Sequence, residues 1–317
     1  MNFYRAVRAV TDASGEGPVD WVAVGDAAKA VTAPGTLDLA PADERAYAAD
    51  VRAARDQIRS VAGVDFDLPE TVEIQNRHHW IDANVVTFER ILDLLEPEAG
   101  LMPGIARSLN TGSMAFAVGF LANNVLGQYD PRLLSPGAGD DHSLYFVHPN
   151  IRRVSRQLDA DEDRFRRWIA FHEVSHAAEF GAAPWLTDHL EDLIETTLRD
   201  LSAARFNRDD FLAIDTTMTA VEGYAELLMD QTFDEEYEDL RRKLDARRRG
   251  GGPIAQLIRR LLGLGRKRRQ YERGKDFFEA VVNARDLRTA NLVWERPENL
   301  PTDDELRNPT RWLTRVA

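Results

Sequence analysis

The feature that most constrains this chain is a pair of histidines four residues apart, His172 and His176, with Glu173 directly after the first. Side chains at positions i and i+4 project from the same face of an α-helix, so a helix here would hold both imidazoles side by side. Two imidazoles in this arrangement can bind one metal ion, and the adjacent glutamate can hold a water molecule on that ion. The motif therefore predicts a helix that carries a zinc site.

The residues around the motif favour such a helix. Apolar residues recur at helical spacing upstream of His172, and no residue from Asp161 to Phe180 breaks a helix. Gly181 and Pro184 follow and are typical of the end of a helix. We expect the motif to lie on one helix that ends at these two residues.

A second motif supplies a candidate third ligand. Glu222 stands forty-six residues after His176, and Glu226 follows one helical turn later. A catalytic zinc ion needs three protein ligands, and ligand histidines usually donate their second ring proton to a carboxylate or a carbonyl. We assign Glu222 to the metal and Glu226 to a hydrogen bond with a ligand histidine, with Asp230 as a weaker alternative for that hydrogen bond.

The segment around Glu222 has helical periodicity of its own. An apolar stripe runs from Met218 to Met229, and Asp215 or Thr216 can cap the start of the helix. On such a helix Glu222 and Glu226 could instead belong to a solvated face, as most helical glutamates do. The pairing with the upstream histidines favours the metal site.

Other ligands and donors can be compared with the sequence. The longer pattern with a third histidine needs glycine at position 179 and histidine at position 182, but the chain has Glu179 and Ala182. His189 follows the motif closely enough to be a competing ligand, a hydrogen-bond donor to the transition state, or a structural residue. Tyr224 is a second candidate for that donor.

With these motifs in place, the chain resembles the gluzincin branch of the zincin metallopeptidases, in which two histidines and a downstream glutamate bind zinc. It resembles more narrowly a zincin-like family of zinc metallopeptidases, some members of which are labelled as associated with deazaflavin coenzyme biosynthesis. The resemblance covers most of the chain and is carried by Asn76–Trp80 with Ala83 and Asn84, Leu126–Asp130, Leu144–Val147, Pro184–Leu186, Glu222–Glu226, and Leu261–Leu264 with Gln270 and Tyr271.

This resemblance implies a zincin-like fold, one zinc ion per chain and hydrolysis of a peptide or protein substrate. It also suggests that the strand from Leu144 to Val147 lines the cleft and pairs with an extended substrate.

Composition restricts the partners. The chain has no cysteine, so any metal must be held by histidine, carboxylate and water. A net charge of -13 disfavours nucleic acid as a partner.

An acidic, lysine-poor surface is also what a salt-rich cytoplasm favours, because salt screens carboxylate repulsion. A halophilic origin is therefore a hypothesis. Full helicity and activity in dilute buffer would remove its support.

The sequence also carries expectations about location. Met1 to Val10 contains no apolar core followed by a cleavage site, so we expect no secretion signal and a cytoplasmic protein. The most apolar run, Met114 to Ala122, is much shorter than the roughly twenty residues of a membrane-spanning helix. We interpret it as a buried helix.

The expected fold is a single α+β domain over residues 1–317, predominantly helical, with a small sheet beside the motif helix. We divide it into an N-terminal helical part (1–125), a part with the sheet and the metal-binding helices (126–232), and a linker with a C-terminal helical part (233–317). Helical spacing recurs from Pro41 to Val61 and from Thr71 to Leu95.

Two short strands are expected from Gly127 to Leu134 and from Ser143 to His148, joined by a glycine-rich loop. The remaining histidines, His78, His79, His142 and His148, are interpreted as packing, structural or surface residues.

Near the C-terminus an acidic run is followed by a basic one and by Gly250-Gly251-Gly252-Pro253, which is typical of a solvated helix and a flexible joint. Residues 254–269 then form a basic amphipathic pattern. Such a helix can lie on an anionic membrane or pack on its own acidic domain, and we favour packing.

Together these observations predict that His172, His176 and Glu222 bind zinc, and that Glu173 acts as the base in peptide-bond hydrolysis. Two other functions stay open. The site could persist without turnover in a scaffold that binds a peptide or a protein partner, or it could hold mononuclear iron, because two histidines and a carboxylate also suit non-haem iron. The intact Glu173 favours hydrolysis over both.

Overall fold

The computed structural model describes residues 3–12, 17–92, 103–131, 133, 142–203, 205–233, 237–249 and 270–317. Its longer helices are α1 (Phe3–Thr11), α2 (Trp21–Val31), α3 (Pro41–Ala62), α4 (Arg77–Leu92), α5 (Pro103–Ala122), α6 (His148–Gln157), α7 (Glu162–Ala182), α8 (Trp185–Ser202), α9 (Arg208–Thr232), α10 (Glu238–Arg249), α12 (Gln270–Ala284) and α15 (Pro309–Val316). Shorter helical turns are α13 (Leu287–Asn291), η2 (Leu292–Trp294), η3 (Pro297–Asn299) and α14 (Asp303–Arg307). The predicted α+β class, predominantly helical, is confirmed.

The strands β1 (Thr71–Gln75), β2 (Gly127–Asp130) and β3 (Ser143–Val147) form one sheet with β3 in the centre. β1 pairs with β3 in parallel, and β2 pairs with it in the antiparallel direction. All five residues of β3 are buried. Because both edges of β3 are already paired, the expectation that Leu144 to Val147 pairs with a substrate is wrong. The strand packed against the motif helix is the edge strand β2.

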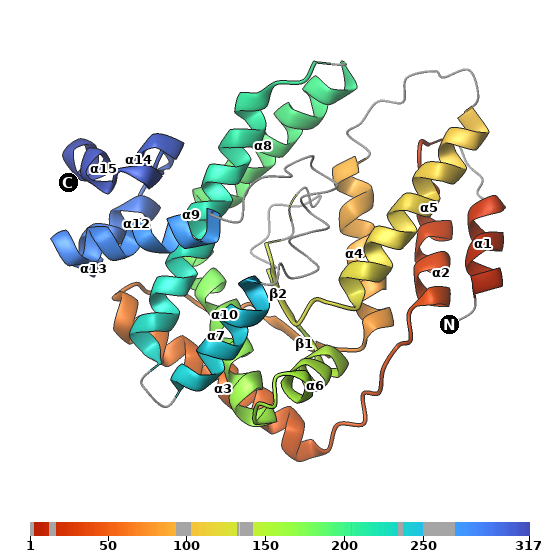
Figure 1. Cartoon of the computed structure of the whole chain (residues 1–317), viewed down its shortest axis with the longest axis horizontal. Helices are drawn as coiled ribbons and strands as arrows, with labels where there is room; N and C mark the ends of the chain where they lie inside the picture. The colour runs from red at the N-terminus through yellow and green to blue at the C-terminus, as the bar shows by residue number, and fades with distance from the viewer. Residues whose placement is uncertain are drawn as a thin grey trace.

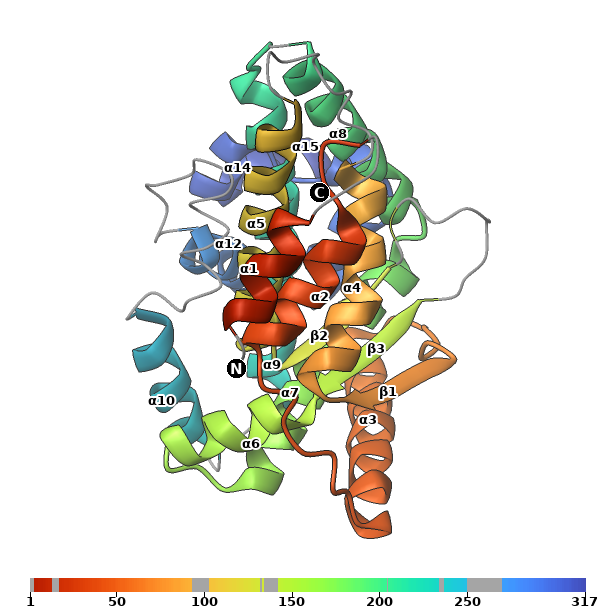
Figure 2. The same ribbon diagram turned by 90° about the vertical axis from the view of Figure 1, so that its right-hand side faces the viewer.

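Helices pack on both sides of this small sheet. Figure 1 shows α1, α2, α4 and α5 on one side, and α7, α9 and α12 on the other. Figure 2 shows the first group face on, with the sheet below it. Each group has its own buried apolar cluster, and the larger one surrounds α3, α7, α9 and α12. Residues of β3 contribute to both clusters, so the sheet lies where the two groups meet.

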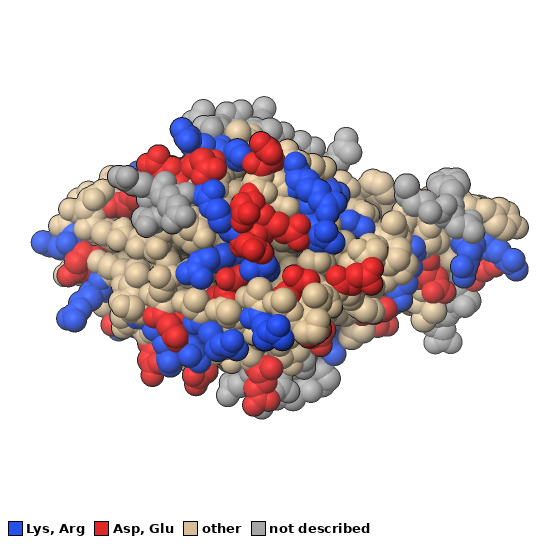
Figure 3. Space-filling model, turned by 90° about the horizontal axis from the view of Figure 1, so that it is seen from below, with Lys and Arg blue, Asp and Glu red and all other residues tan. Residues whose placement is uncertain are grey.

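Ion pairs join helices at the surface. On the face shown in Figure 3, acidic and basic side chains lie in alternating groups. Among the ion pairs between helices, Arg164 with Asp239 at 2.8 Å links α7 to α10. Deeper in the molecule, Arg166 of α7 contacts Asp50 of α3 at 2.8 Å.

Several predicted elements are confirmed and others are wrong. The helix predicted from Pro41 to Val61 is α3, which ends at Gly63 in the left-handed conformation (φ 66°). The helix predicted from Thr71 is wrong at its start, because Thr71–Gln75 is the strand β1. There the β-branched residues pair with β3, and the Asn76 side chain accepts the backbone N–H groups of His78 and His79 to begin α4.

The helix that carries Glu222 begins earlier than predicted. Asn207 caps α9 through the backbone N–H of Asp209, so Asp215 and Thr216 lie inside the helix and the predicted cap is wrong. The helix continues to Thr232, and most of the predicted apolar stripe is buried, although Met218 is 39% exposed.

The predicted strand from Ser143 is confirmed as β3, although His148 begins α6. The preceding strand, β2, ends at Asp130, and residues 132 and 134–141 lie outside the described ranges. The glycine-rich joint and the basic segment 254–269 also lie outside them. The division of the domain into three parts stays a prediction.

The apolar run Met114 to Ala122 forms the end of α5. Val118 and Ala122 are buried while Phe116 is 66% exposed, so this helix buries one face rather than its whole surface. Within the described ranges, no helix combines the length and the apolar character needed to cross a membrane.

Three of the four histidines interpreted as packing, structural or surface residues contact other residues. His78 Nε2 lies 2.7 Å from the carbonyl oxygen of Thr32, and His148 Nδ1 lies 3.0 Å from the hydroxyl of Tyr47. His142 contacts the hydroxyl of Tyr129, and His79 is exposed.

Candidate metal centre

The helix α7 holds the two histidines of the motif on one face. Asp161 caps it by accepting the backbone N–H of Arg164 at 2.9 Å. The apolar residues of α7 are buried against α3 and α9. The imidazole centroids of His172 and His176 lie 4.9 Å apart and the ring planes meet at 75°. The two rings therefore lie together at one point on the surface of α7.

Glu222 reaches the same point from α9. Its Oε2 lies 4.0 Å from Nε2 of His172, and one ligand atom from each of His172, His176 and Glu222 lies within 4.8 Å of the others. A tetrahedral zinc ion with bonds of about 2.0–2.2 Å separates its ligands by roughly 3.4 Å. Small side-chain rotations would close the difference, so these three residues fit a zinc ion.

A buried carboxylate that the sequence reasoning missed orients His176. Glu179 Oε2 lies 2.8 Å from Nδ1 of His176, and the glutamate side chain has no exposed surface. With its proton on Nδ1, His176 donates to this carboxylate and directs the lone pair of Nε2 toward the metal position. The signal was present in the sequence, because residues three apart on a helix are neighbours.

Electrostatics match this arrangement. Burial lowers the pKa of His176, but the negative charge of Glu179 and its hydrogen bond, with Glu222 and Glu173 nearby, raise that pKa overall to about 10. Burial raises the pKa of Glu179 to about 7, although His176 opposes the shift. Without a cation at the site, the buried Glu173 and Glu179 and the partly exposed Glu222 therefore together favour the protonated form of His176. A divalent cation would neutralise the same negative charges.

Glu173 lies beside the ligands and is held by the edge strand. Its side chain is largely buried, and its Oε2 accepts the backbone N–H of Tyr129 in β2 at 2.9 Å. Burial and, to a smaller extent, the charge of Glu222 raise the pKa of Glu173 to about 7, against the opposing effects of His176 and of the Tyr129 hydrogen bond. A carboxylate with this pKa can both accept and release a proton near neutral pH.

A family model described as "Zincin-like metallopeptidase" matches residues 19–215 and 203–313. The chain belongs to this family. The matched residues include His172, His176 and Glu222, which could hold a metal ion, and the expected zincin-like resemblance is confirmed.

A solved structure is similar to this chain over nearly its whole length. It is described as "a putative hydrolase with a novel fold" from Chloroflexus aurantiacus, and it aligns with a TM-score of 0.75 at 32% sequence identity. The alignment covers 99% of this chain and 98% of that one. Among curated proteins, none matches the chain.

Two carboxylates of α9 beyond Glu222 were predicted near the ligands of this zincin-like protein. Asp230 instead contacts Arg241 of α10 and Lys275 of α12, the latter at 2.8 Å. Glu226 is partly exposed one turn after Glu222, and its hydrogen bond with a ligand histidine stays a prediction. For His176 the carboxylate partner is Glu179.

The two predicted donors to the transition state have other contacts. His189 lies in α8, where its ring meets that of Trp185 edge-on and its Nε2 lies 3.5 Å from the Thr217 hydroxyl. Burial lowers the pKa of His189, so the neutral ring is favoured. The buried Tyr224 donates its hydroxyl to Asn291 at 2.6 Å. Their role as donors stays a prediction.

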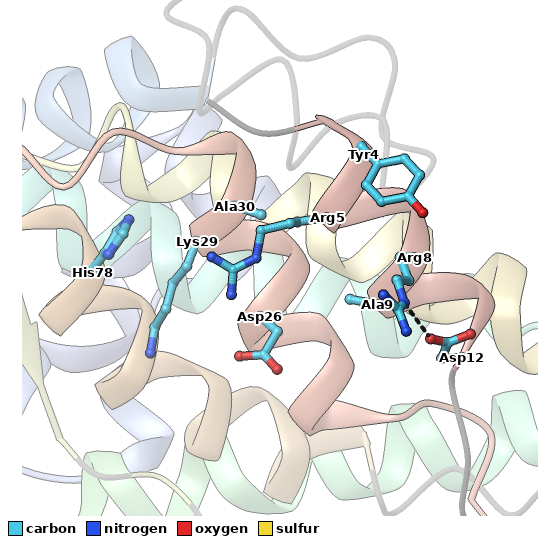
Figure 4. A pocket seen from close by; sticks show the side chains of 9 residues that line it. All are labelled: Tyr4, Arg5, Arg8, Ala9, Asp12, Asp26, Lys29, Ala30 and His78. Atoms are coloured by element: carbon cyan, nitrogen blue, oxygen red, sulfur yellow. Dashed lines mark hydrogen bonds and ion pairs between the residues drawn. The ribbon is translucent and has the colours of Figure 1, made fainter.

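A cavity of about 500 Å³ lies apart from these residues, beside α1, α2 and α4. Figure 4 shows its lining of mixed charge, in which Arg8 pairs with Asp12 at 3.3 Å. Lys29, also in the lining, pairs with Asp82. The predicted ligands and Glu173 are not part of this cavity.

Proposed function

We propose that this zincin-like metallopeptidase hydrolyses peptide bonds with one zinc ion held by His172, His176 and Glu222. The observation that carries the proposal is the convergence of two imidazoles and one carboxylate within 4.8 Å, beside the buried Glu173. Three protein ligands leave one position of a tetrahedral ion for water, which is the arrangement of a catalytic zinc rather than a structural one.

The chemistry follows from the donor set and from Glu173. Bound by these residues, zinc would lower the pKa of a water molecule toward neutrality and polarise the scissile carbonyl group. The Glu173 carboxylate takes the proton of the attacking water while the new carbon–oxygen bond forms. It then delivers this proton to the leaving nitrogen as the carbon–nitrogen bond breaks, which yields a free carboxylate and an amine.

The buried position of Glu173 suits this proton transfer. Its Oε2 is fixed by the Tyr129 N–H, so the orientation of the carboxylate is set before a substrate arrives. A scaffold that only bound a peptide would have no use for a base in this place. The placement of Glu173 beside the three ligands therefore supports hydrolysis over silent binding.

The proposal is tested by removing and restoring the metal. The protein is incubated with a mixed peptide library, and cleavage is followed by mass spectrometry before chelation, after chelation and after addition of one equivalent of Zn²⁺. We expect cleavage that chelation abolishes and Zn²⁺ restores. Cleavage that survives complete metal removal would contradict zinc catalysis, and a zinc-loaded protein that cleaves no peptide would support the scaffold.

A further inference from the structure

At Gly127 the edge strand β2 leaves space for the Glu173 side chain, and we call this space the cradle. A Cβ atom built on Gly127 would lie 2.5 Å from Cγ, 2.6 Å from Oε1 and 2.8 Å from Cδ of Glu173. Real side chains do not approach so closely, so the Glu173 carboxylate occupies the space that any larger residue at position 127 would need. Gly127 thus keeps this space open.

The next backbone N–H on the same side of the strand completes the cradle. Gly127 and Tyr129 are two residues apart in β2, so they direct their Cβ positions to the same face, and this face lies against α7. While Gly127 admits one carboxylate oxygen, the N–H of Tyr129 binds the other at 2.9 Å. The Tyr129 ring packs on Phe180 of α7, with centroids 5.1 Å apart.

The opposite face of β2 is anchored to α4 by a network of side chains. Gln128, between the two cradle residues, accepts a hydrogen bond from the Trp80 indole N–H at 2.6 Å and donates to the Asn84 side-chain oxygen at 3.0 Å. Asn84 in turn donates to the backbone oxygen of Trp80 at 2.9 Å. Trp80, Asn84 and Gln128 belong to the segments that carry the family resemblance, and none of them is a metal ligand.

We infer that β2 is a positioning element for the catalytic base, in which Gly127 makes room for Glu173, Tyr129 fixes it through the backbone, and Gln128 holds the strand on α4. The inference rests on the proposed function where it concerns catalysis. Its geometric part, the contact between position 127 and Glu173, can be tested without any activity.

The first experiment is a thermal unfolding cycle on the full-length chain with four proteins: the parent, Gly127→Ala, Glu173→Ala and the double variant. In the parent background the added methyl group overlaps Glu173, so we expect Gly127→Ala to lower Tm by about 3 °C or more. In the Glu173→Ala background the overlapping atoms are gone, and the same change should cost less than about 1 °C. Equal shifts of Tm in both backgrounds would contradict the contact between position 127 and Glu173.

The second experiment measures steady-state peptide hydrolysis and bound zinc in Gly127→Ala and Gln128→Met. Displacing a base by a fraction of an ångström to one ångström costs up to about 100-fold in rate. We expect kcat to fall about 100-fold in Gly127→Ala and about 10-fold in Gln128→Met, while KM and the zinc content stay within about twofold of the parent. Loss of zinc, or a rise in KM with kcat unchanged, would contradict a positioning role.

The two experiments separate the two ideas. A parent protein that cleaves no peptide, together with a non-additive unfolding cycle, would reject the proposed function and keep the contact of Gly127 with Glu173. An active parent whose kcat does not respond to either substitution would keep the function and reject the positioning role of β2.

Discussion

Replacement of Glu173 by glutamine is expected to lower kcat for peptide hydrolysis by about 1,000-fold or more, with bound zinc unchanged. Glutamine has the same shape and can still accept the Tyr129 N–H through its amide oxygen. Glutamine cannot take a proton from water at neutral pH. The fall in kcat therefore measures the loss of the base and of nothing else. The fold should not suffer, because burying an amide costs less than burying a carboxylate.

The matched control is Glu162→Gln, at the start of the same helix. Glu162 is partly exposed, contacts Arg152 at 3.2 Å and lies more than two turns before the motif. We expect this variant to keep the kcat of the parent within about twofold and to lose at most about 1 kcal/mol of stability. If Glu173→Gln kept more than a tenth of the parent activity, Glu173 would not be the base.

Replacement of Gly274 by alanine is expected to destabilise the fold by about 3 kcal/mol or more, and to lower Tm by about 6 °C or more. A Cβ atom at this position in α12 would lie 2.1 Å from the backbone oxygen of Thr219 and 3.0 Å from Cα of Gly223, both in α9. Backbone atoms cannot move away as a flexible side chain can. The two helices would have to separate, which opens the core beside the helix that carries Glu222.

Two further variants test the cause of this effect by thermal unfolding. In Gly223→Ala the new Cβ would lie 2.3 Å from the backbone of Gly274, so the same crossing is disturbed and a similar loss is expected. Gly25→Ala in α2 has no atom within 4 Å of the new Cβ, and it should be neutral or stabilising by up to about 1 kcal/mol. If Gly274→Ala behaved like Gly25→Ala, the close crossing of α9 and α12 would be refuted.

The motif helix was predictable because its signals are local. The apolar period, the absence of helix breakers and the spacing of His172 and His176 all lie within one segment, and α7 follows them closely. The strand β1 was missed for the opposite reason. Thr71–Gln75 is extended because it pairs with β3, some seventy residues later, and its apolar residues also fit a helical period.

The surroundings of the site depended more on tertiary structure. Glu179 is three residues after His176 and could have been assigned from helical spacing, but the downstream glutamates at Glu222 and Glu226 offered a competing partner. The contact of Gly127 with Glu173 joins a strand to a helix across 46 positions of the chain, and no local pattern around Gly127 indicates it. Sequence spacing thus identified candidate ligands, whereas the residues that contact those ligands and the base could be identified only from the fold.

The most direct measurement is the metal content of the purified protein by plasma mass spectrometry, in the parent, in Glu222→Ala and in the control Met218→Ala. Met218 lies one turn from Glu222 on the same helix and is 39% exposed, so a general disturbance of α9 would affect both variants alike. We expect close to one zinc ion per chain in the parent, less than about a tenth of that in Glu222→Ala, and most of it retained in Met218→Ala. Full zinc content without Glu222, or a parent that takes up no zinc, would contradict the three-ligand site.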